Sequence, residues 1–229
     1  LAENYPDIKI ASVVGRSFAM DRNGDWEKTR KAYELFTEGK GNSFASASLY
    51  IKIQYAKDLG DEAVEAGALS EREGRIRDGD SVIFFNFRED SVRQLTQSFV
   101  DDSFQFFPRK KLENLFFVTM TEYDKSLPCF STNSCPAAFK SAEIENPLAK
   151  IISAGGLKQL HIAETEKYAH ITYFLNGGME MSFEGEDRIL VPSPSGGHYE
   201  LNPEMSADKI TENVLENLRK YHFIAVNFA

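Results

Sequence analysis

The sequence has no excess of positive charge and no long apolar run. Its 229 residues include 26 lysines and arginines against 35 aspartates and glutamates, for a formal net charge of −9. A general nucleic-acid binder or a protein that binds anionic membranes carries a basic face, so the composition argues against both. The longest apolar runs, such as VIFF at 82–85, are far shorter than the roughly 20 residues of a membrane span. No secretory signal begins the chain.

Cysteine is also scarce. The only two cysteines, Cys129 and Cys135, are separated by five residues, which is not the spacing of a zinc-binding pair. Free cysteine usually behaves as a small apolar side chain. We therefore expect reduced thiols without a functional role, in a cytoplasmic protein.

Several motifs that would reveal an enzyme class are missing. There is no Gly-x-Ser-x-Gly elbow, no Walker loop, no dinucleotide glycine fingerprint and no His-Glu-x-x-His pattern. The histidines form no i, i+4 pair; they are His161, His170, His198 and His222. No metal site can be assembled from these residues, and no nucleophile or general base is evident.

What the sequence does contain is an alternation of strand and helix patterns. Short apolar runs rich in β-branched and aromatic residues predict strands at 8–14, 81–87, 115–120, 160–163, 170–175 and 223–228. Apolar residues at helical spacing predict helices at 26–36, 47–59, 92–99, 148–154 and 206–220. This alternation predicts an α/β fold with mainly parallel sheets and flanking helices, in which 81–87 and 223–228 are buried strands.

Two of these helices carry specific signals. Asp25 is placed to cap the first, which Gly39 would end, and one face of it would be buried through Trp26, Thr29, Tyr33 and Phe36. The last helix is expected to bury Ile210, Val214, Leu215 and Leu218. Between 128 and 147 the pattern lapses into small, polar and proline-broken residues. We interpret that stretch as a domain boundary, although a long surface loop has the same composition.

Three arginines follow predicted strands and precede predicted helices. Arg16 and Arg22 come after the first strand, and Arg88 comes after 81–87. Ligand-binding groups lie beyond the carboxyl ends of strands in α/β sheets, helix N-termini favour anions, and a guanidinium matches phosphate or carboxylate bidentately. The arrangement suits a phosphorylated small acid. The alternative is that the arginines pair with nearby acidic residues, namely Asp21 and Glu89 or Asp90.

A fourth cation, Lys167, lies in the sequence HIAETEKYAHIT between two predicted strands. A lysine there is a point charge for a phosphate or a leaving oxygen. The alternative is a hydrated lysine in an acidic turn.

Long motifs in this chain resemble the cofactor-independent phosphoglycerate mutases. They are GRSFAMDRNGDWEKTRKAYELFTEGKG, DGDSVIFFNFREDSVRQLT, HIAETEKYAHITYFLNGGME, FEGEDRILVPSP, NPEMSA and IAVNFA. The resemblance implies that 1–142 is an inserted phosphotransferase domain, incomplete at its N-terminal side. It also implies that 143–229 is part of an alkaline-phosphatase-like domain that stops before the metal-ligand motifs, so both ends look cut.

The same resemblance implies an activity. The family's enzymes are glycolytic isomerases that interconvert 3-phosphoglycerate and 2-phosphoglycerate through a phosphoserine, assisted by two manganese ions. The serine and the metal ligands have no counterpart here, so we expect this fragment alone to be inactive. The implied partner is a small-molecule substrate, with no nucleic acid and no membrane, in a monomeric, cytoplasmic parent. Two alternatives stay open: a non-catalytic phosphate-binding module, and a mutase-like enzyme for another phosphorylated acid.

Carried over residue by residue, the arginine of the family's GR motif is Arg16, that of MDR is Arg22, and the first of NFRxDR is Arg88. The lysine of ETEKY is Lys167, which the resemblance places near the phosphoryl group and the metals. Ser91 stands where the family usually has the second NFRxDR arginine.

Arg93 follows two residues later, roughly 200° around a helix. Either a neighbouring arginine substitutes for the missing one, or the clamp lacks a charge-assisted contact of about 1.5–3 kcal/mol. A third interpretation is that Ser91 simply caps the helix.

Overall fold

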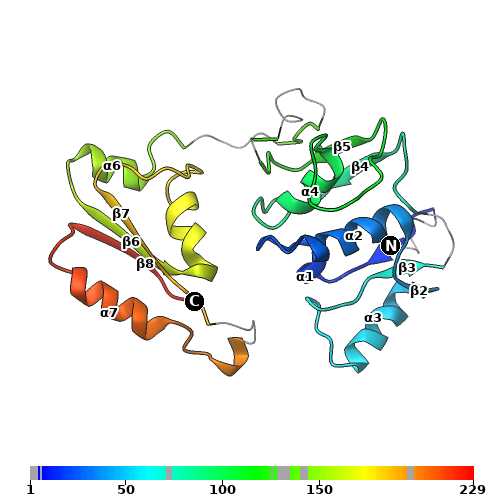
Figure 1. Ribbon diagram of the computed structural model, residues 1–229, viewed down its shortest axis with the longest axis horizontal. Coiled ribbons are helices and arrows are strands. Elements are labelled where there is room, and N and C mark those ends of the chain that lie inside the picture. The colour runs from blue at the N-terminus through cyan, green and yellow to red at the C-terminus, as the bar shows by residue number, and fades with distance from the viewer. Residues whose placement is uncertain are drawn as a thin grey trace. The chain divides into compact units, whose positions relative to one another are not determined.

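The computed structural model describes residue 5 and residues 7–70, 74–124, 126–127, 135–139, 144–194 and 199–229. The chain divides into two compact units, residues 1–141 and 142–229 (Figure 1). Both combine helices with parallel strand pairs, so the predicted α/β class is confirmed. Among the described residues, no helix combines the length and apolar character that crossing a bilayer requires.

Unit 1, residues 1–141, contains two small sheets. One has the strand order β1-β3-β2 and the other pairs β4 with β5. The strands are β1 (Ser12–Val13), β2 (Asn42–Phe44), β3 (Gly67–Leu69), β4 (Ser81–Phe84) and β5 (Phe116–Thr119). The helices are α1 (Arg16–Ala19), α2 (Trp26–Glu38), α3 (Ala47–Ala56) and α4 (Arg93–Val100). β1 runs antiparallel to β3, whereas the other pairs are parallel.

Helix α2 is built as its sequence predicts. The Asp25 carboxylate accepts a hydrogen bond from the Lys28 backbone N–H, and Gly39 ends the helix at φ 73° in the left-handed region. Thr29 and Tyr33 are buried. The same face packs against α4 and β5 in one apolar cluster that includes Ala32, Tyr33, Leu95, Phe99 and Phe117.

The second predicted strand of unit 1 is shorter and more exposed than expected. It ends at Phe84 instead of residue 87, and Ile83 and Phe85 are 70% and 77% exposed. Val82 and Phe84 pack on the core. Alternate side chains of a strand face opposite sides of a sheet, and only one side of this pair packs on the core. The prediction that 81–87 is buried is therefore wrong.

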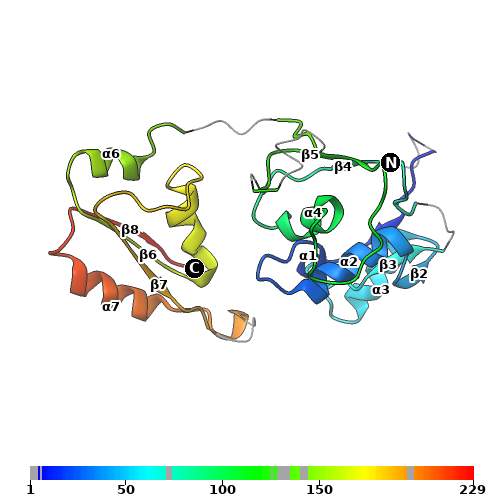
Figure 2. The same ribbon diagram turned by 45° about the horizontal axis from the view of Figure 1, so that its top comes forward.

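Unit 2, residues 142–229, is built around a parallel sheet of order β7-β6-β8. All six residues of the central strand β6 are buried. The strands are β6 (Gln159–Glu164), β7 (Glu186–Val191) and β8 (Phe223–Asn227). The helices are α6 (Leu148–Ala154), η1 (Thr165–Lys167), η2 (His170–Phe174), η3 (Tyr199–Leu201) and α7 (Ala207–Asn217). In both views α6 and α7 lie on opposite sides of this sheet (Figures 1 and 2).

Three predictions in unit 2 are wrong. In the segment predicted as a strand at 170–175, residues 170–174 form the π-helix η2. Their β-branched and aromatic side chains favour a strand locally, but packing on β6 and β8 decides the conformation. In α7, Ile210 and Val214 pack on the sheet, whereas Leu215 and Leu218 are exposed because they extend past the narrow stripe that faces the core. The strand β8 is only partly buried, since it lies at the sheet edge.

The expectation of reduced thiols is also wrong. Cys135 is disulfide-bonded, and none of the described cysteines is free. Its side chain is buried in the apolar cluster of unit 1. The other cysteine of the sequence, Cys129, lies outside the described residues.

A buried polar network lies at the amino ends of β6 and β7. The Glu186 carboxylate accepts hydrogen bonds from Arg188 Nε at 2.6 Å and Asn176 Nδ2 at 2.8 Å. His161 Nδ1 lies 3.5 Å from Glu186 Oε1, and both side chains are fully buried. The network joins two strands to the loop that follows η2.

This histidine makes the stability of unit 2 depend on pH. Burial lowers the pKa of His161, although the Glu186 charge opposes the shift. Because the pKa in the folded state lies below the unfolded value of about 6.5, protonation favours the unfolded chain. We expect the free energy of unfolding to be greatest above the unfolded-state pKa of His161, and to fall as the pH drops from there through its folded-state pKa. Thermal unfolding of unit 2 from about pH 8 to 5 measures the slope.

Two variants show which histidine is responsible. His161→Gln should flatten the pH dependence. His222→Gln is the comparison variant, which removes an exposed ring whose Nδ1 accepts from the Lys158 N–H at 3.1 Å and leaves the buried His161 in place. An undiminished slope in the His161 variant would contradict the assignment.

Candidate anion-binding site

Two of the predicted arginines meet on one carboxylate. Arg22 Nη1 donates to Asp90 Oδ2 at 2.9 Å, and Arg88 Nε donates to Asp90 Oδ1 at 2.8 Å. Arg88 Nη2 also reaches Oδ2 at 3.4 Å. Arg22 comes from the loop between α1 and α2, whereas Arg88 comes from the turn after β4. The fold thus places guanidinium groups from two distant segments side by side.

The shared carboxylate stays ionised. Burial by itself raises the pKa of Asp90, but hydrogen bonds from Arg88 and Arg22, together with their charges, bring it below the ordinary value. The Asp90 side chain is only 16% exposed, whereas that of Arg88 is 46% exposed. The cluster of two arginines and one aspartate therefore keeps a net positive charge, and Arg88 remains accessible to a dissolved anion.

The loop that carries Arg22 is fixed by its own backbone contacts. Asp21 Oδ1 accepts hydrogen bonds from the backbone N–H groups of Asn23 and Asp25, at 3.1 and 2.9 Å. Gln94 of α4 accepts from the Gly24 N–H at 3.0 Å, and its amide donates to Thr29 Oγ1 in α2 at 3.0 Å. A buried glutamine therefore links the Arg22 loop to the helix that follows Arg88.

The turn that carries Arg88 is fixed by a buried tyrosine. Tyr123 is fully buried, and its hydroxyl contacts the carbonyl oxygens of both Phe84 and Asn86. The Asn86 carboxamide oxygen in turn accepts from the Arg88 backbone N–H at 2.8 Å. The direction of Arg88 therefore depends on a side chain that does not contact it.

Removing that hydroxyl should loosen the turn. We expect Tyr123→Phe to lower the free energy of unfolding of unit 1 by about 1–3 kcal/mol, because buried carbonyls lose a partner. Chemical denaturation followed by fluorescence of Trp26, the single tryptophan, measures the loss. Tyr55→Phe is the control, since Tyr55 is exposed and its hydroxyl donates to the surface carboxylate of Asp61. Equal losses in the two variants would contradict the role of Tyr123.

Arg16 lies apart from this pair in its contacts. It opens α1, and its Nη1 pairs with the exposed Glu62 at 3.4 Å. Both side chains are more than half exposed, so the pair is weak. The alternative that the arginines pair with acids is thus correct in part: Asp90 is a partner and Asp21 is not, because its carboxylate accepts from backbone N–H groups.

Ser91 does not cap the following helix. It is 1% exposed and its Oγ donates to Asp90 Oδ1 at 3.2 Å, whereas α4 starts after Val92 without a side-chain cap. Arg93 Nε donates to the Tyr123 carbonyl at 2.8 Å. Arg93 therefore holds the same tyrosine that supports the Arg88 turn.

Lys167 belongs to unit 2. It is the last residue of the short helix η1, which directly follows the carboxyl end of β6. The sequence had instead predicted a loop between two strands at this position. Glu164, at the end of β6, is fully buried, and its Oε1 accepts from the Ser206 N–H at 3.5 Å. Glu166 accepts from the Tyr199 hydroxyl at 3.1 Å. Within the described part of the chain, Lys167 forms no ion pair.

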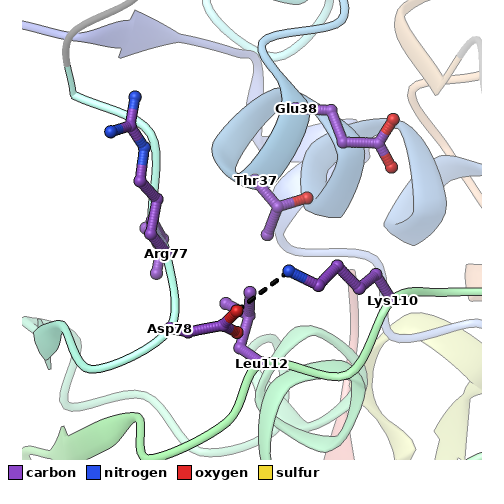
Figure 3. A pocket seen from close by; sticks show the side chains of 7 residues that line it. Thr37, Glu38, Arg77, Asp78, Lys110 and Leu112 are labelled. Atoms are coloured by element: carbon purple, nitrogen blue, oxygen red, sulfur yellow. Dashed lines mark hydrogen bonds and ion pairs between the residues drawn. The ribbon is translucent and has the colours of Figure 1, made fainter.

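A separate cavity of about 350 Å³ lies at the other end of α2 (Figure 3). Its lining includes Thr37 and Glu38 of that helix with Arg77, Asp78 and Lys110. Lys110 Nζ is bound to Asp78 Oδ2 at 2.9 Å. Since α2 has 13 residues, this cavity is about 20 Å from the loop of Arg22. It supplies matched control residues for the arginine cluster.

Sequence reasoning missed the side chains that support the arginines. Local spacing indicates Asp90 only as a nearby partner of an arginine, and no pattern in the sequence points to Gln94 or Tyr123. The burial of Gln94, which is 9% exposed, is visible only in the structure, where a buried polar group calls for hydrogen-bond partners.

Comparisons with known proteins identify the family of this chain. The family model described as "BPG-independent PGAM N-terminus" matches residues 1–125, more than half of the chain. The chain belongs to this family.

Curated relatives of this family match nearly the whole chain. The 2,3-bisphosphoglycerate-independent phosphoglycerate mutase of Moorella thermoacetica is 47% identical over 226 residues, covering 96% of this chain and 42% of that protein. One from Methanosarcina barkeri is 45% identical and covers 97% of this chain and 43% of that protein. The resemblance seen in the sequence is therefore confirmed.

A solved structure extends the match to the fold. Phosphoglycerate mutase of Leishmania mexicana, determined at low cobalt concentration, superposes with a TM-score of 0.77 at 27% identity. It covers 98% of this chain and 42% of that protein. The chain spans about two fifths of the length of the family members that it matches.

Proposed function

We propose that this chain is a segment of a longer phosphoglycerate mutase, an isomerase that interconverts 3-phosphoglycerate and 2-phosphoglycerate in glycolysis. The observation that carries the proposal is the pairing of Arg22 with Arg88 around Asp90 in a chain of this family. Residues 1–142 would form the phosphotransferase domain, and 143–229 part of an alkaline-phosphatase-like domain. The division of the chain into two compact units after residue 141 supports this.

The arginines would bind and orient the substrate anion. Arg22 and Arg88 offer guanidinium forks at one place, which suits the bidentate recognition of a phosphate or a carboxylate. Arg16 would add a third cation, at the cost of its weak pair with Glu62. We propose that no neighbouring arginine replaces the second arginine of the NFRxDR motif, since Ser91 is buried and Arg93 Nε is bound to the Tyr123 carbonyl.

Lys167 would serve the phosphoryl group in unit 2. It follows the carboxyl end of a buried parallel strand, where such folds present ligand-binding groups. A lysine ammonium is a compact positive charge suited to a phosphoryl oxygen. We assign it this role and no part in proton transfer.

A divalent metal, for which we propose manganese, would support phosphoryl transfer as a Lewis acid. The related Leishmania mexicana structure was determined at low cobalt concentration. The residues that the structure describes contain no group of three or more His, Cys, Asp or Glu that could hold a metal ion. We propose, as the resemblance implies, that the ligands of both manganese ions belong to the rest of the longer enzyme, and we assign no step to the ions.

The proposal is tested with two proteins. The first is a full-length enzyme that contains this chain and matches its relatives in length, and the second is the 229-residue chain alone. We expect mutase turnover in the first, restored by manganese after chelation, and none in the second. The chain alone should bind 3-phosphoglycerate in a calorimetric titration.

Other results would overturn the proposal. Turnover by the isolated chain would show that the catalytic groups lie within it. A full-length protein inactive on phosphoglycerate would leave the two alternatives, which activity on other phosphorylated acids separates. Activity on another acid would identify a mutase-like enzyme, whereas binding without any turnover would identify a phosphate-binding module. We propose a cytoplasmic, monomeric enzyme, which fractionation and sedimentation test.

A further inference from the structure

We propose that Asp90 is a positioning residue that holds Arg22 and Arg88 in the geometry that binds the substrate anion. The inference rests on the proposed function, and it concerns a residue that would not itself contact the substrate. A carboxylate in an anion site is expected to repel the ligand, so its presence there requires a reason. The contacts of Asp90 supply one.

Three side chains converge on this carboxylate. Arg22 donates to Oδ2, Arg88 donates to both oxygens, and Ser91 Oγ donates to Oδ1. Arginine has a long, flexible side chain, and ordering it costs conformational entropy. A partly buried, ionised partner orders two such side chains before the ligand arrives, so their ordering does not weaken ligand binding.

Other contacts hold the backbone segments that carry the two arginines, including one between the segments themselves, where Asn86 Nδ2 lies 4.0 Å from Met20 Sδ. The Arg22 loop is tied to α4 through Gln94, and the Arg88 turn is tied to Tyr123. In the described residues, Asp90 is the group that joins the two guanidiniums directly. Orientation of one arginine relative to the other therefore depends on it.

The sign of one measurement separates this role from simple charge balance. If Asp90 only neutralises the arginines, removing its charge makes the site more positive, and KM for 3-phosphoglycerate should fall. If Asp90 positions them, the same substitution should raise KM in spite of the added positive charge. Long-range electrostatics and local geometry thus predict opposite results.

The first experiment uses the full-length enzyme with Asp90→Asn, Asp90→Glu and the control Asp78→Asn. Asp78 is also an ion-paired aspartate of unit 1, but it lies at the cavity at the far end of α2 (Figure 3). We expect Asp90→Asn to raise KM by about 10- to 100-fold, with a much smaller change in kcat, by analogy with other residues that orient ligand-binding groups. Asp90→Glu should recover part of the loss, and Asp78→Asn should match the wild type.

The second experiment does not depend on mutase activity. Signals of the arginine Nε–H groups are followed by NMR in the 229-residue chain while 3-phosphoglycerate is added. The Arg88 Nε–H should be protected from solvent exchange in the wild type, because it is bound to Asp90, and should lose protection in Asp90→Asn. This measurement remains informative if the proposed function fails.

Each outcome decides the matter. A higher KM in Asp90→Asn, partial rescue by glutamate and lost Arg88 protection support positioning. A lower or unchanged KM, or retained protection, overturns it. If Asp90→Asn does not fold, Asp90→Glu carries the test, and failure of both to fold overturns the proposal in favour of a purely structural role. An inactive wild-type enzyme counts against the proposed function alone.

Discussion

Replacing Arg88 with alanine in the full-length enzyme should lower kcat/KM for 3-phosphoglycerate by about 10- to 150-fold. A hydrogen bond to a charged group contributes about 1.5–3 kcal/mol, and each 1.4 kcal/mol is about tenfold. The side chain is accessible, and its fork is held by Asp90, so the loss falls on ligand binding and not on folding. The effect should appear mainly in KM if the arginine holds substrate and transition state equally.

Adding Arg22→Ala to this variant should reduce kcat/KM by less than the product of the single effects. The two arginines share Asp90, and residues with a common partner do not act additively. The matched control is Arg77→Ala, which removes an exposed arginine of unit 1 at the separate cavity. Full activity in Arg88→Ala, or equal losses in Arg77→Ala, would contradict the assignment of the site.

The largest effect on stability is expected from Glu186→Ala. The carboxylate is fully buried and bound to Arg188 and Asn176, and it also accepts from the Phe183 N–H at 3.0 Å. Burial by itself raises the pKa of Glu186, but these hydrogen bonds and the neighbouring positive charge lower it, so the group is ionised in the folded protein. Its removal leaves a largely buried guanidinium without its partner, which costs about 3–5 kcal/mol.

Hydrogen exchange of the β6 amides is the direct measurement of this loss. The free energy of opening of the β6 amides should decrease by the same amount, because the network joins β6 to β7. Glu184→Ala is the control, since Glu184 is exposed two residues away on the same turn. Unchanged protection in Glu186→Ala would show that the network does not stabilise the sheet.

Local sequence signals were sufficient to predict helices whose ends carry capping or helix-breaking residues. Helix α2 has an aspartate that caps it and a glycine that ends it, and α6 begins directly after Pro147. These features act over a few residues, so periodicity and capping chemistry located both helices. The strands β4 and β5 were found because their apolar runs are flanked by polar turns.

Elements decided by distant packing were not predicted correctly. Residues 170–174 have strand-like composition, yet they form a π-helix that packs on β6 and β8. β7 was not predicted, because Glu186 and Arg188 interrupt its apolar pattern. The buried side chains that contact Glu186 include some from β6 and from the loop after η2, and the local sequence of β7 does not indicate these contacts.

In the candidate site, too, local features could be predicted from the sequence and contacts between distant residues could not. The strand-end arginines were found from local pattern, and the resemblance identified which of them matter. Their common partner could not be found in this way. Asp90 is next to Arg88 in sequence but 68 residues from Arg22, and local spacing predicts only the nearer contact.

That separation has a consequence for how unit 1 folds. The Arg22–Asp90 and Gly24–Gln94 hydrogen bonds join residues that are 68 and 70 positions apart in the sequence. The intervening segment includes β2, α3 and β3. Contacts between such distant residues form slowly, although the entropy of closure grows only with the logarithm of chain length. Modest insertions near α3 should therefore be tolerated. A substitution that delays closure, however, would lower the yield of binding-competent protein without altering any residue that contacts the ligand.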